Sequence, residues 1–578
     1  MKMMTITRCL VTAAGCGVAF SVASAVPDQV PGTQTQDPTL KPAQPSKPPA
    51  PGMIQGAGPA AAPASPADGA TISVSRFTFS GNDSQPDDKL AAQVAPYLGR
   101  PLTLAQLGEA ADAVKRYYRA QGWFLAQAYI PAQAPASGVV DIAVLEGRID
   151  TVTINVADDA PMSKSYANNL ANHFLKSGQT ITENGIERPL LLLRDVPRVD
   201  AKSVIDPGST AGTASITVNV VTDPDAPRIN GRLEFDNYGS RTTGKNRLGG
   251  EINVNNPYGL GDQLSLRGFR ANENGNGFGR VGYSLPVGPL GTRVGVSAAR
   301  LDYVLGKEIA ALGANGVANV ISANAAHPLM RSKNNNLFLQ LVFERKKLDD
   351  RTTTPVATSD RRTLNTGRLQ LNGDVRDDFS GVTVYSISGM RGDLKIDDPE
   401  LAFLDQQPDF GARAAGKFNK LMYSVQRLQQ LAPPLHLLLS VSGQQSNKNL
   451  HAAEKFTIGG DNTVRAFPVG TLVGDHGVAA TAELRFAPSM LKYNRFDAVA
   501  TLFYDYGRTT RNHDNSNLKY EYNSSHISGY GVGLNLGYAD KFLLKVSAAW
   551  QHKGLDPLDP AFVPKGGARI WAQAAYAF

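Results

Sequence analysis

The larger part of the chain, residues 227–578, shows one pattern: apolar side chains alternate with polar or small ones. Between positions 531 and 538 the apolar members are Val532, Leu534, Leu536 and Tyr538, and the others are Gly531, Gly533, Asn535 and Gly537. A period of two predicts β-strands with one apolar face. No run of about 18 to 20 apolar residues follows position 25, so we expect no helical membrane span. A barrel strand needs only about ten residues with alternate ones apolar. The pattern therefore fits a β-sandwich or a membrane barrel.

Three further features favour the membrane barrel. Short connections such as residues 286–291 are combined with long polar ones, as in barrels whose two ends differ. The chain ends on Tyr576, Ala577 and Phe578, a strand that closes on an aromatic residue. Its only cysteines, Cys9 and Cys16, lie in the first 25 residues, so an exported form would contain no disulfide.

The amino terminus has the composition of a secretory leader. Lys2 and Arg8 precede an apolar segment, and Ala23-Ser24-Ala25 forms a cleavage site, which predicts a signal peptide over residues 1–25. A lipoprotein site at Cys16 would leave too short an apolar segment. Residues 26–70 contain eleven prolines and no aromatic residue, so we expect an extended Pro/Ala-rich linker.

Two α+β domains are predicted between the linker and the barrel, over residues 71–147 and 148–225. In the first, Thr103 and Gln106 form a capping box, and Gly122 ends the helix that follows. The order strand, helix, helix, strand, strand, together with Gln121-Gly122-Trp123 and Leu145-Glu146-Gly147-Arg148-Ile149, resembles a polypeptide-transport-associated (POTRA) domain. Residues 185–197 resemble the long helix of a second copy. The family usually has glycine where Arg198 stands.

Two short motifs lie inside the barrel region. Val464, Arg465, Ala466 and Phe467 follow Gly459-Gly460 in a loop, and Phe503, Asp505 and Gly507 lie in a strand. Alternation places Asp505 on the lumen-facing row of that strand. An unpaired charge away from bulk water is costly, so a buried Arg465 and Asp505 would need each other. Taken without any family, Asp505 and Arg485 could equally be ordinary lumen charges.

These motifs resemble the lumen-loop and barrel-wall motifs of two-partner secretion transporters, within the superfamily of Omp85-type barrels. The resemblance implies a transmembrane β-barrel of 16 antiparallel strands over residues 226–578, preceded by two POTRA domains. It also implies a loop near 456–478 that folds into the lumen and brings Arg465 to Asp505. Ala466 stands where the family has glycine, and alanine restricts the backbone where glycine does not. Tyr576 and Phe578 would be the C-terminal signal for barrel insertion.

Enzymatic chemistry is not expected. Residues 411–417 have the spacing of a phosphate loop, but Phe418 replaces the Ser or Thr that would bind Mg²⁺. There is no G-x-S-x-G elbow and no H-x-x-x-H pair. We predict no catalytic residue, no cofactor and no metal. The net charge of +7 is spread thinly, so nucleic acid is not an expected partner.

The resemblance implies export of a large unfolded exoprotein, such as an adhesin or a cytolysin, from the periplasm across the outer membrane without nucleotide hydrolysis. Outer-membrane lipid and the barrel-assembly machinery would be the other partners. An outer-membrane assembly or insertion factor of the same superfamily is the alternative, although such relatives typically carry more POTRA copies. A passive porin or uptake receptor would leave both POTRA-like domains without a role.

Overall fold

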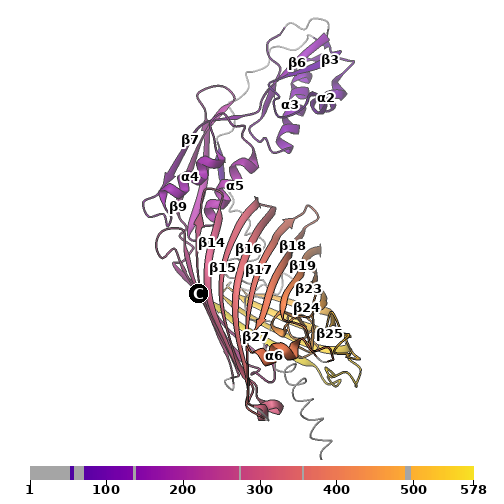
Figure 1. Cartoon of the computed structure of the whole chain (residues 1–578). Coiled ribbons are helices and arrows are strands. Elements are labelled where there is room, and N and C mark those ends of the chain that lie inside the picture. Colours follow the sequence, from indigo (N-terminus) through magenta and orange to yellow (C-terminus); the bar gives the residue numbers. More distant parts are fainter. Residues whose placement is uncertain are drawn as a thin grey trace, which may run out of the picture.

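The protein is a closed β-barrel with two α/β domains arranged in series at one end (Figure 1). This arrangement comes from a computed structural model, and the residues described are 53–56, 71–133, 138–272, 275–354, 357–409, 411–487, 496–539 and 541–578. The predicted signal peptide and all of the predicted linker except residues 53–56 lie outside them. No helix among the described residues is both long enough and apolar enough to cross a membrane.

The first domain packs two helices against a three-stranded sheet of order β3-β6-β5. Its elements are β2 (Thr71–Ser73), β3 (Arg76–Ser80), α2 (Asp87–Val94), η1 (Ala95–Tyr97), β4 (Pro101–Thr103), α3 (Leu104–Ala120), β5 (Gln127–Tyr129) and β6 (Val139–Leu145). Helix α3 begins with the predicted capping box, in which the Thr103 side chain and the Gln106 side chain each bond the other's backbone N–H. The strand that follows α3 is confined to β5, because a turn occupies residues 121–125.

The link between the two domains is held by Glu146. Its carboxylate accepts hydrogen bonds from the Ser84 backbone N–H (2.6 Å) and the Tyr118 hydroxyl (3.0 Å). Burial and the neighbouring Glu146 both raise the pKa of Tyr118, so this phenol stays protonated and donates. The Leu145-Glu146-Gly147 segment therefore fixes the exit of the first domain rather than forming a reactive site.

The second domain contains β7 (Arg148–Val156), α4 (Lys164–Phe174), α5 (Glu183–Arg194), β8 (Val199–Pro207) and β9 (Thr213–Thr222). Apolar side chains of α5, including Leu190 and Leu193, are fully buried against the sheet. Arg198, where the resembling family has glycine, adopts a φ of +68°. Glycine enters that left-handed region without strain and arginine does not, which accounts for the family's preference.

A short strand from the linker region completes the sheet of the second domain. Strand β1 (Ile54–Gly56) runs parallel to β8, giving the order β1-β8-β9-β7. Met53 precedes it, is buried, and its carbonyl accepts a hydrogen bond from the Ser203 N–H (3.0 Å). Composition alone did not predict this strand, because the surrounding segment is Pro/Ala-rich.

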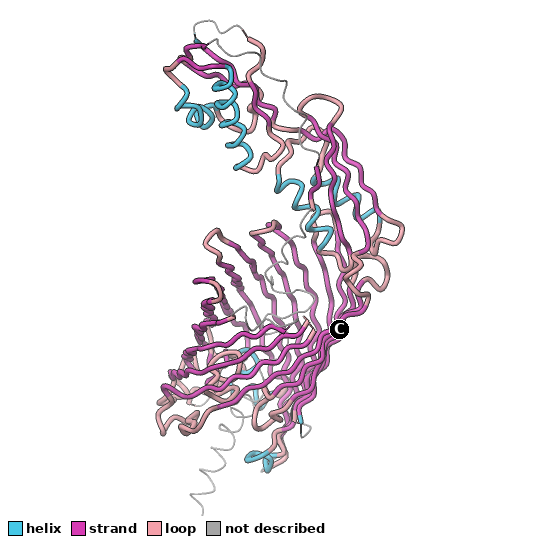
Figure 2. Tube along the Cα trace, turned by 180° about the vertical axis from the view of Figure 1, so that it is seen from behind, coloured by secondary structure: helices cyan, strands magenta, loops and turns pink. Residues whose placement is uncertain are grey.

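Sixteen antiparallel strands among the described residues close into the barrel, and helices outside the two N-terminal domains are short (Figure 2). The strands are β10 (Ile229–Asp236), β11 (Arg247–Asn255), β12 (Gln263–Ala271), β13 (Asn276–Val287), β14 (Thr292–Val304), β15 (Asn315–Arg331), β16 (Asn335–Thr352), β17 (Thr358–Arg376), β18 (Gly381–Ile396), β19 (Gly416–Ala432), β20 (Leu435–Ser446), β23 (His476–Phe486), β24 (Phe496–Thr510), β25 (Ser524–Tyr538), β26 (Phe542–Lys553) and β27 (Arg569–Ala577). The connections contain η4 (Lys307–Leu312), α6 (Pro399–Asp405), η5 (Ala452–Glu454), β21 (Phe456–Ile458) and β22 (Leu472–Gly474).

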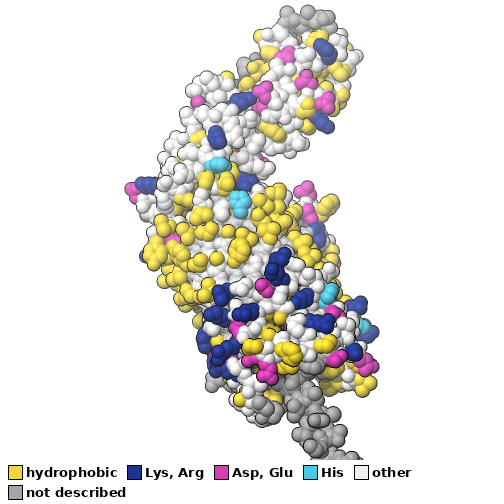
Figure 3. All heavy atoms as spheres, in the orientation of Figure 1, with side chains coloured by type: hydrophobic (Ala, Val, Ile, Leu, Met, Phe, Trp, Pro, Cys, Tyr) yellow, Lys and Arg dark blue, Asp and Glu magenta, His cyan; other side chains and the backbone are white. Residues whose placement is uncertain are grey.

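The outward side chains of these strands form an apolar band around the barrel (Figure 3). Large apolar residues such as Ile321, Phe343 and Leu369 are exposed there, while their neighbours along each strand face inward. A band of this kind is what a strand surface in contact with lipid requires.

The second domain is fixed to the barrel through α5. The Arg331 guanidinium at the end of β15 donates to both carboxylate oxygens of Asp195 (2.9 and 2.8 Å). Arg188 donates to the carbonyl of Pro328 (3.0 Å). These contacts identify the turn between β15 and β16 as lying at the barrel end beside the N-terminal domains.

Candidate functional site

The connection between β20 and β23 folds back into the barrel, and residues 447–475 are called the lumen loop below. Its two arms pair as β21 and β22, and its tip contains Arg465. The tip contacts inward-facing residues of β23, β24, β25 and β27. The loop was expected near 456–478, and it ends slightly earlier because His476 already belongs to β23.

Arg465 binds Asp505 through three hydrogen bonds. Its Nε donates to Asp505 Oδ2 (2.9 Å), its Nη2 to Oδ1 (2.9 Å) and its backbone N–H to Oδ2 (3.1 Å). Asp505 is fully buried, and Thr481 Oγ1 also donates to it (2.9 Å). The predicted pair therefore forms, with the two-pronged geometry that makes arginine–carboxylate contacts strong and directional.

A second carboxylate and an aromatic ring complete the environment of the Arg465 guanidinium. Glu483 accepts from Arg465 Nη1 (2.7 Å) and from Arg485 Nε (2.8 Å). The Arg465 Cζ atom lies 3.2 Å from the centroid of the Phe503 ring, a cation–π contact. Alternation along β23 places Glu483 on the lumen face but does not indicate that it contacts Arg465.

Two glycines of the barrel wall allow the loop tip to lie flat against it. A Cβ on Gly507 would stand 2.5 Å from Ile458 Cγ2, and one on Gly529 would stand 2.3 Å from the Cβ of Ala466. Ala466 does not have a positive φ, so its backbone carries no strain of the kind that glycine would relieve. Gly529 provides the space for the Ala466 methyl group, and the departure from the family pattern is thereby accommodated.

The last barrel strand also holds the tip. Trp571 on β27 donates its Nε1–H to the carbonyl of Arg465 (2.7 Å). Val464 and Phe467 on either side are fully buried in one apolar cluster that includes Phe503. The predicted loop residues Val464, Arg465, Ala466 and Phe467 therefore all pack against the wall, in which Phe503, Asp505 and Gly507 of β24 lie opposite them.

A buried ion-pair cluster fastens the middle of the lumen loop. Glu454 is almost completely buried, and its carboxylate lies 2.8 Å from Lys346 Nζ on β16 and 2.7 Å from Lys420 Nζ on β19. Glu344 adds a longer contact to Lys346 (3.4 Å). Lys346 lies on β16, across the barrel in strand order from the strands that hold the tip, and Lys420 lies on β19, two strands before β23, so the loop is tied to a second part of the wall.

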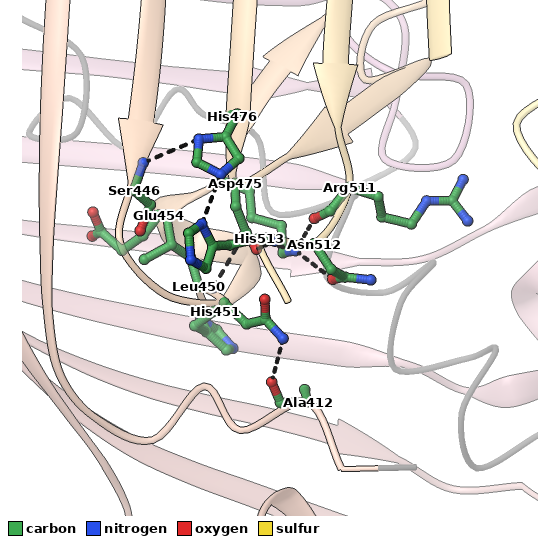
Figure 4. Close-up of polar contacts among 12 residues, drawn as sticks. Ala412, Ser446, Leu450, His451, Glu454, Asp475, His476, Arg511, Asn512 and His513 are labelled. Atoms are coloured by element: carbon green, nitrogen blue, oxygen red, sulfur yellow. Dashed lines mark hydrogen bonds and ion pairs between the residues drawn. The ribbon is translucent and has the colours of Figure 1, made fainter. Parts of the chain in front are cut away.

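The base of the lumen loop is held by Asp475 (Figure 4). Its carboxylate accepts from the backbone N–H groups of Leu450 (3.0 Å) and His513 (2.8 Å) and pairs with Lys455 Nζ (2.9 Å). His476 Nε2 and His513 Nδ1 lie 3.0 Å apart. Asp475 thus joins both arms of the loop to the next connection along the chain.

Tyr576 and Phe578 lie at the seam where the barrel closes. Phe578 and Gly231 exchange two backbone hydrogen bonds of 3.0 Å each, next to the pairing of β27 with β10. The Phe578 ring covers Gly231, where a Cβ would come within 2.5 Å of it, and Tyr576 faces outward. These residues therefore take part in closing the barrel.

The second domain presents a hollow of about 500 Å³ beside the free edge of its sheet. It is lined by Ile154, Asn155 and Val156 of β7, by Lys164 and Asn168 of α4, and by part of β9. The opposite edge, β8, is covered by β1. One edge of this sheet therefore already accepts an extended segment, and the other is open.

Comparisons with known proteins agree with this geometry. The family described as haemolysin secretion/activation protein ShlB/FhaC/HecB matches residues 214–536, and the ShlB-type POTRA domain matches residues 72–147. The heme/hemopexin transporter protein HuxB of Haemophilus influenzae is 27% identical over 464 residues, which cover 80% of each chain. The outer membrane transporter CdiB of Escherichia coli is 25% identical and is covered to 71%, against 74% of this chain.

A solved structure of CdiB from Escherichia coli has the same fold. It superposes with a TM-score of 0.69 at 20% sequence identity, covering 88% of this chain and 91% of that one. CdiB from Acinetobacter baumannii gives a TM-score of 0.60 at 17% identity.

Proposed function

We propose a transport mechanism for this chain, which belongs to the ShlB/FhaC/HecB family of haemolysin secretion/activation proteins. It is an outer-membrane transporter of the two-partner secretion type, with a β-barrel in the membrane and two POTRA domains in the periplasm. Its relatives are transporters and not enzymes, and we extend this to the present chain. The observation that carries the mechanism is the lumen loop, whose tip is bound to the wall by Arg465 and Asp505.

The first step is capture of an extended polypeptide in the periplasm. A strand added to an open sheet edge gains main-chain hydrogen bonds, which give recognition that depends little on sequence. The pairing of β1 with β8 supports this step, because it is an example of such an addition. The β7 edge and its adjoining hollow offer a second place for it. The cargo would be one large secreted exoprotein, such as an adhesin or a cytolysin.

The second step is passage through the barrel. The loop tip, tied to β23, β24 and β27, would leave the wall so that the polypeptide can enter the lumen. Folding of the exported chain outside the cell would oppose its return, so no nucleotide is required. Tyr576 and Phe578 would act earlier, as the signal by which the barrel-assembly machinery inserts this protein.

The proposal is tested by export of a large secreted exoprotein that carries an epitope tag and is produced in the same cells as this chain. Cells with the wild-type transporter should release the tagged protein, and cells without the transporter should retain it in the periplasm. Export that is unchanged in Arg465→Ala, with the barrel inserted normally, would remove the lumen loop from the mechanism. Loss of several unrelated outer-membrane barrels on depletion would instead indicate an insertion factor.

A further inference from the structure

Four neighbouring strands of the barrel extend well beyond the apolar band. Strands β15 to β18 have 16 to 19 residues, whereas about ten suffice to cross the membrane. Their turn at Arg331 contacts Asp195 of the second POTRA domain, so the opposite ends lie on the cell surface. On β15 and β16 the highest exposed large apolar side chains are Ile321 and Phe343, which are 68% and 55% exposed.

Basic side chains lie directly beyond that apolar limit. Arg345 and Lys347 follow Phe343 on the same outward row of β16, about 7 and 14 Å further along the strand. Register places Lys347 beside Thr363, which in turn lies beside Lys395, and Arg361 opposite Asp349. We call Arg345, Lys347, Arg361 and Lys395 the outer basic patch. Figure 3 shows the corresponding concentration of Lys and Arg next to the apolar band, at the end away from the POTRA domains.

The outer basic patch lines a surface hollow of about 520 Å³. Five cationic side chains border it, the four of the patch and Arg362, against two carboxylates. Both carboxylates already have partners: Asp349 binds Arg351 (2.6 Å), and Asp397 accepts from Thr363 (3.3 Å) and lies 3.9 Å from Lys395 Nζ. Arg362 in turn is paired with Asp360. Within the described part of the chain, the side chains of Arg345 and Lys347 make no hydrogen bond and no ion pair. The hollow therefore has an excess of cationic donors directed outward.

The position of the excess positive charge indicates which ligand the hollow would bind. Its cations face sideways from the barrel, continuous with the surface that contacts lipid tails, rather than toward the lumen or the loop tips. At that height the outer leaflet presents its polar headgroups. Guanidinium groups bind phosphate through paired hydrogen bonds, and lysine supplies a point charge. Clusters of such residues beside a membrane recognise anionic headgroups.

We propose that the outer basic patch binds the phosphorylated headgroup of the glycolipid that forms the outer leaflet. The acyl chains of that lipid would lie against Ile321 and Phe343, and its phosphates would lie in the hollow among Arg345, Lys347, Arg361 and Lys395. Binding would fix the height of the longest strands in the membrane. This site is separate from the lumen loop and does not depend on the transport mechanism.

Purified full-length protein in detergent, titrated with bisphosphorylated lipid A and followed by native mass spectrometry, tests the proposal. The double variant Arg345→Gln/Lys347→Gln should bind lipid A at least tenfold more weakly than wild type. The matched control is Arg508→Gln/Lys553→Gln, which removes the same charge from exposed positions on β24 and β26. It should retain wild-type affinity, and heat-modifiable migration should show that all three barrels are folded.

The remaining arms separate a lipid site from a site for free anions. Lipid A without phosphates should bind wild type as weakly as the bisphosphorylated form binds the patch variant. Inorganic phosphate at millimolar concentration should not displace bisphosphorylated lipid A. Equal affinity of all three proteins, equal losses in both double variants, or full displacement by inorganic phosphate would each overturn the proposal.

Discussion

Replacement of Arg465 with alanine should release the tip of the lumen loop from the barrel wall. The substitution removes two side-chain bonds to Asp505 and one to Glu483, and both of these carboxylates are buried. Without the guanidinium, Asp505 keeps Thr481 as a side-chain donor and Glu483 keeps Arg485. In Arg465→Ala the buried negative charges of Asp505 and Glu483 are therefore poorly compensated while the tip stays bound to the wall.

The size of the effect follows from that burial. Removing one partner of a buried ion pair typically costs about 3–5 kcal/mol. Since every 1.4 kcal/mol is a factor of ten, the equilibrium between bound and released tip should move by roughly two to nearly four orders of magnitude. Loss of the Phe503 stacking contact acts in the same direction.

Labelling of a buried thiol measures the position of the tip. The chain has cysteines only at positions 9 and 16, and Val464 is fully buried beside Arg465, so Val464→Cys introduces a reporter. Reaction of intact cells with a membrane-impermeant maleimide should be slow in the Val464→Cys protein and at least a hundredfold faster when Arg465→Ala is added. Ser516→Cys, in an exposed connection, is the positive control.

Arg485→Ala is the matched variant. Arg485 also pairs with Glu483, but its side chain is one-third exposed and none of its hydrogen bonds goes to Asp505. It should leave the labelling rate of Val464→Cys within a few fold of its starting value. Equal labelling with and without Arg465→Ala would refute the claim that this residue holds the tip.

Three further substitutions test other parts of the structure. Gly529→Val should expose the tip to labelling as Arg465→Ala does, because a Cβ at Gly529 would collide with Ala466. Gly537→Val on the same strand should not, because a Cβ there meets nothing closer than 3.9 Å. Similar labelling rates in the two variants would contradict the close packing of the tip against Gly529. Lys346→Met leaves Glu454 with one lysine and should cost about 3–5 kcal/mol of stability, so the heat-modifiable gel shift should occur at a lower temperature. An unchanged transition temperature would contradict the stabilising role of the ion-pair cluster. Burial raises the pKa of the Glu187 carboxyl, so its charged form destabilises the fold and Glu187→Gln should melt at a higher temperature than wild type at pH 8. The difference in melting temperature should shrink as the pH falls through the raised pKa. Melting temperatures that run parallel across the pH range would contradict a raised pKa for Glu187.

Alternation along single strands was enough to predict which residues face the lumen. Asp505 lies on the inward row of β24 and Tyr504 on the outward row, as a period of two requires. Alternation gives the face of a residue but not its neighbour on the next strand. The contact of Glu483 with Arg465 depends on how far the loop reaches, and so it could not be predicted from position alone.

The backbone explains two departures from the family's pattern that the sequence could only point out. Arg198 occupies a left-handed position that glycine would adopt without strain. Ala466 is tolerated because Gly529, sixty-three positions later, has no side chain. Strand β1 was missed for a related reason, since its pairing partner lies on β8 and its own surroundings have the composition of a linker.

Passage of the exported polypeptide through the barrel lumen is the central claim, and site-specific photo-cross-linking tests it directly. A photoreactive amino acid at Gln370, which faces inward on β17, should cross-link to the tagged exoprotein during export. The same group at the adjacent Leu369, which faces the apolar band, should not. Cross-links from Leu369 but none from Gln370 would contradict transport through the lumen.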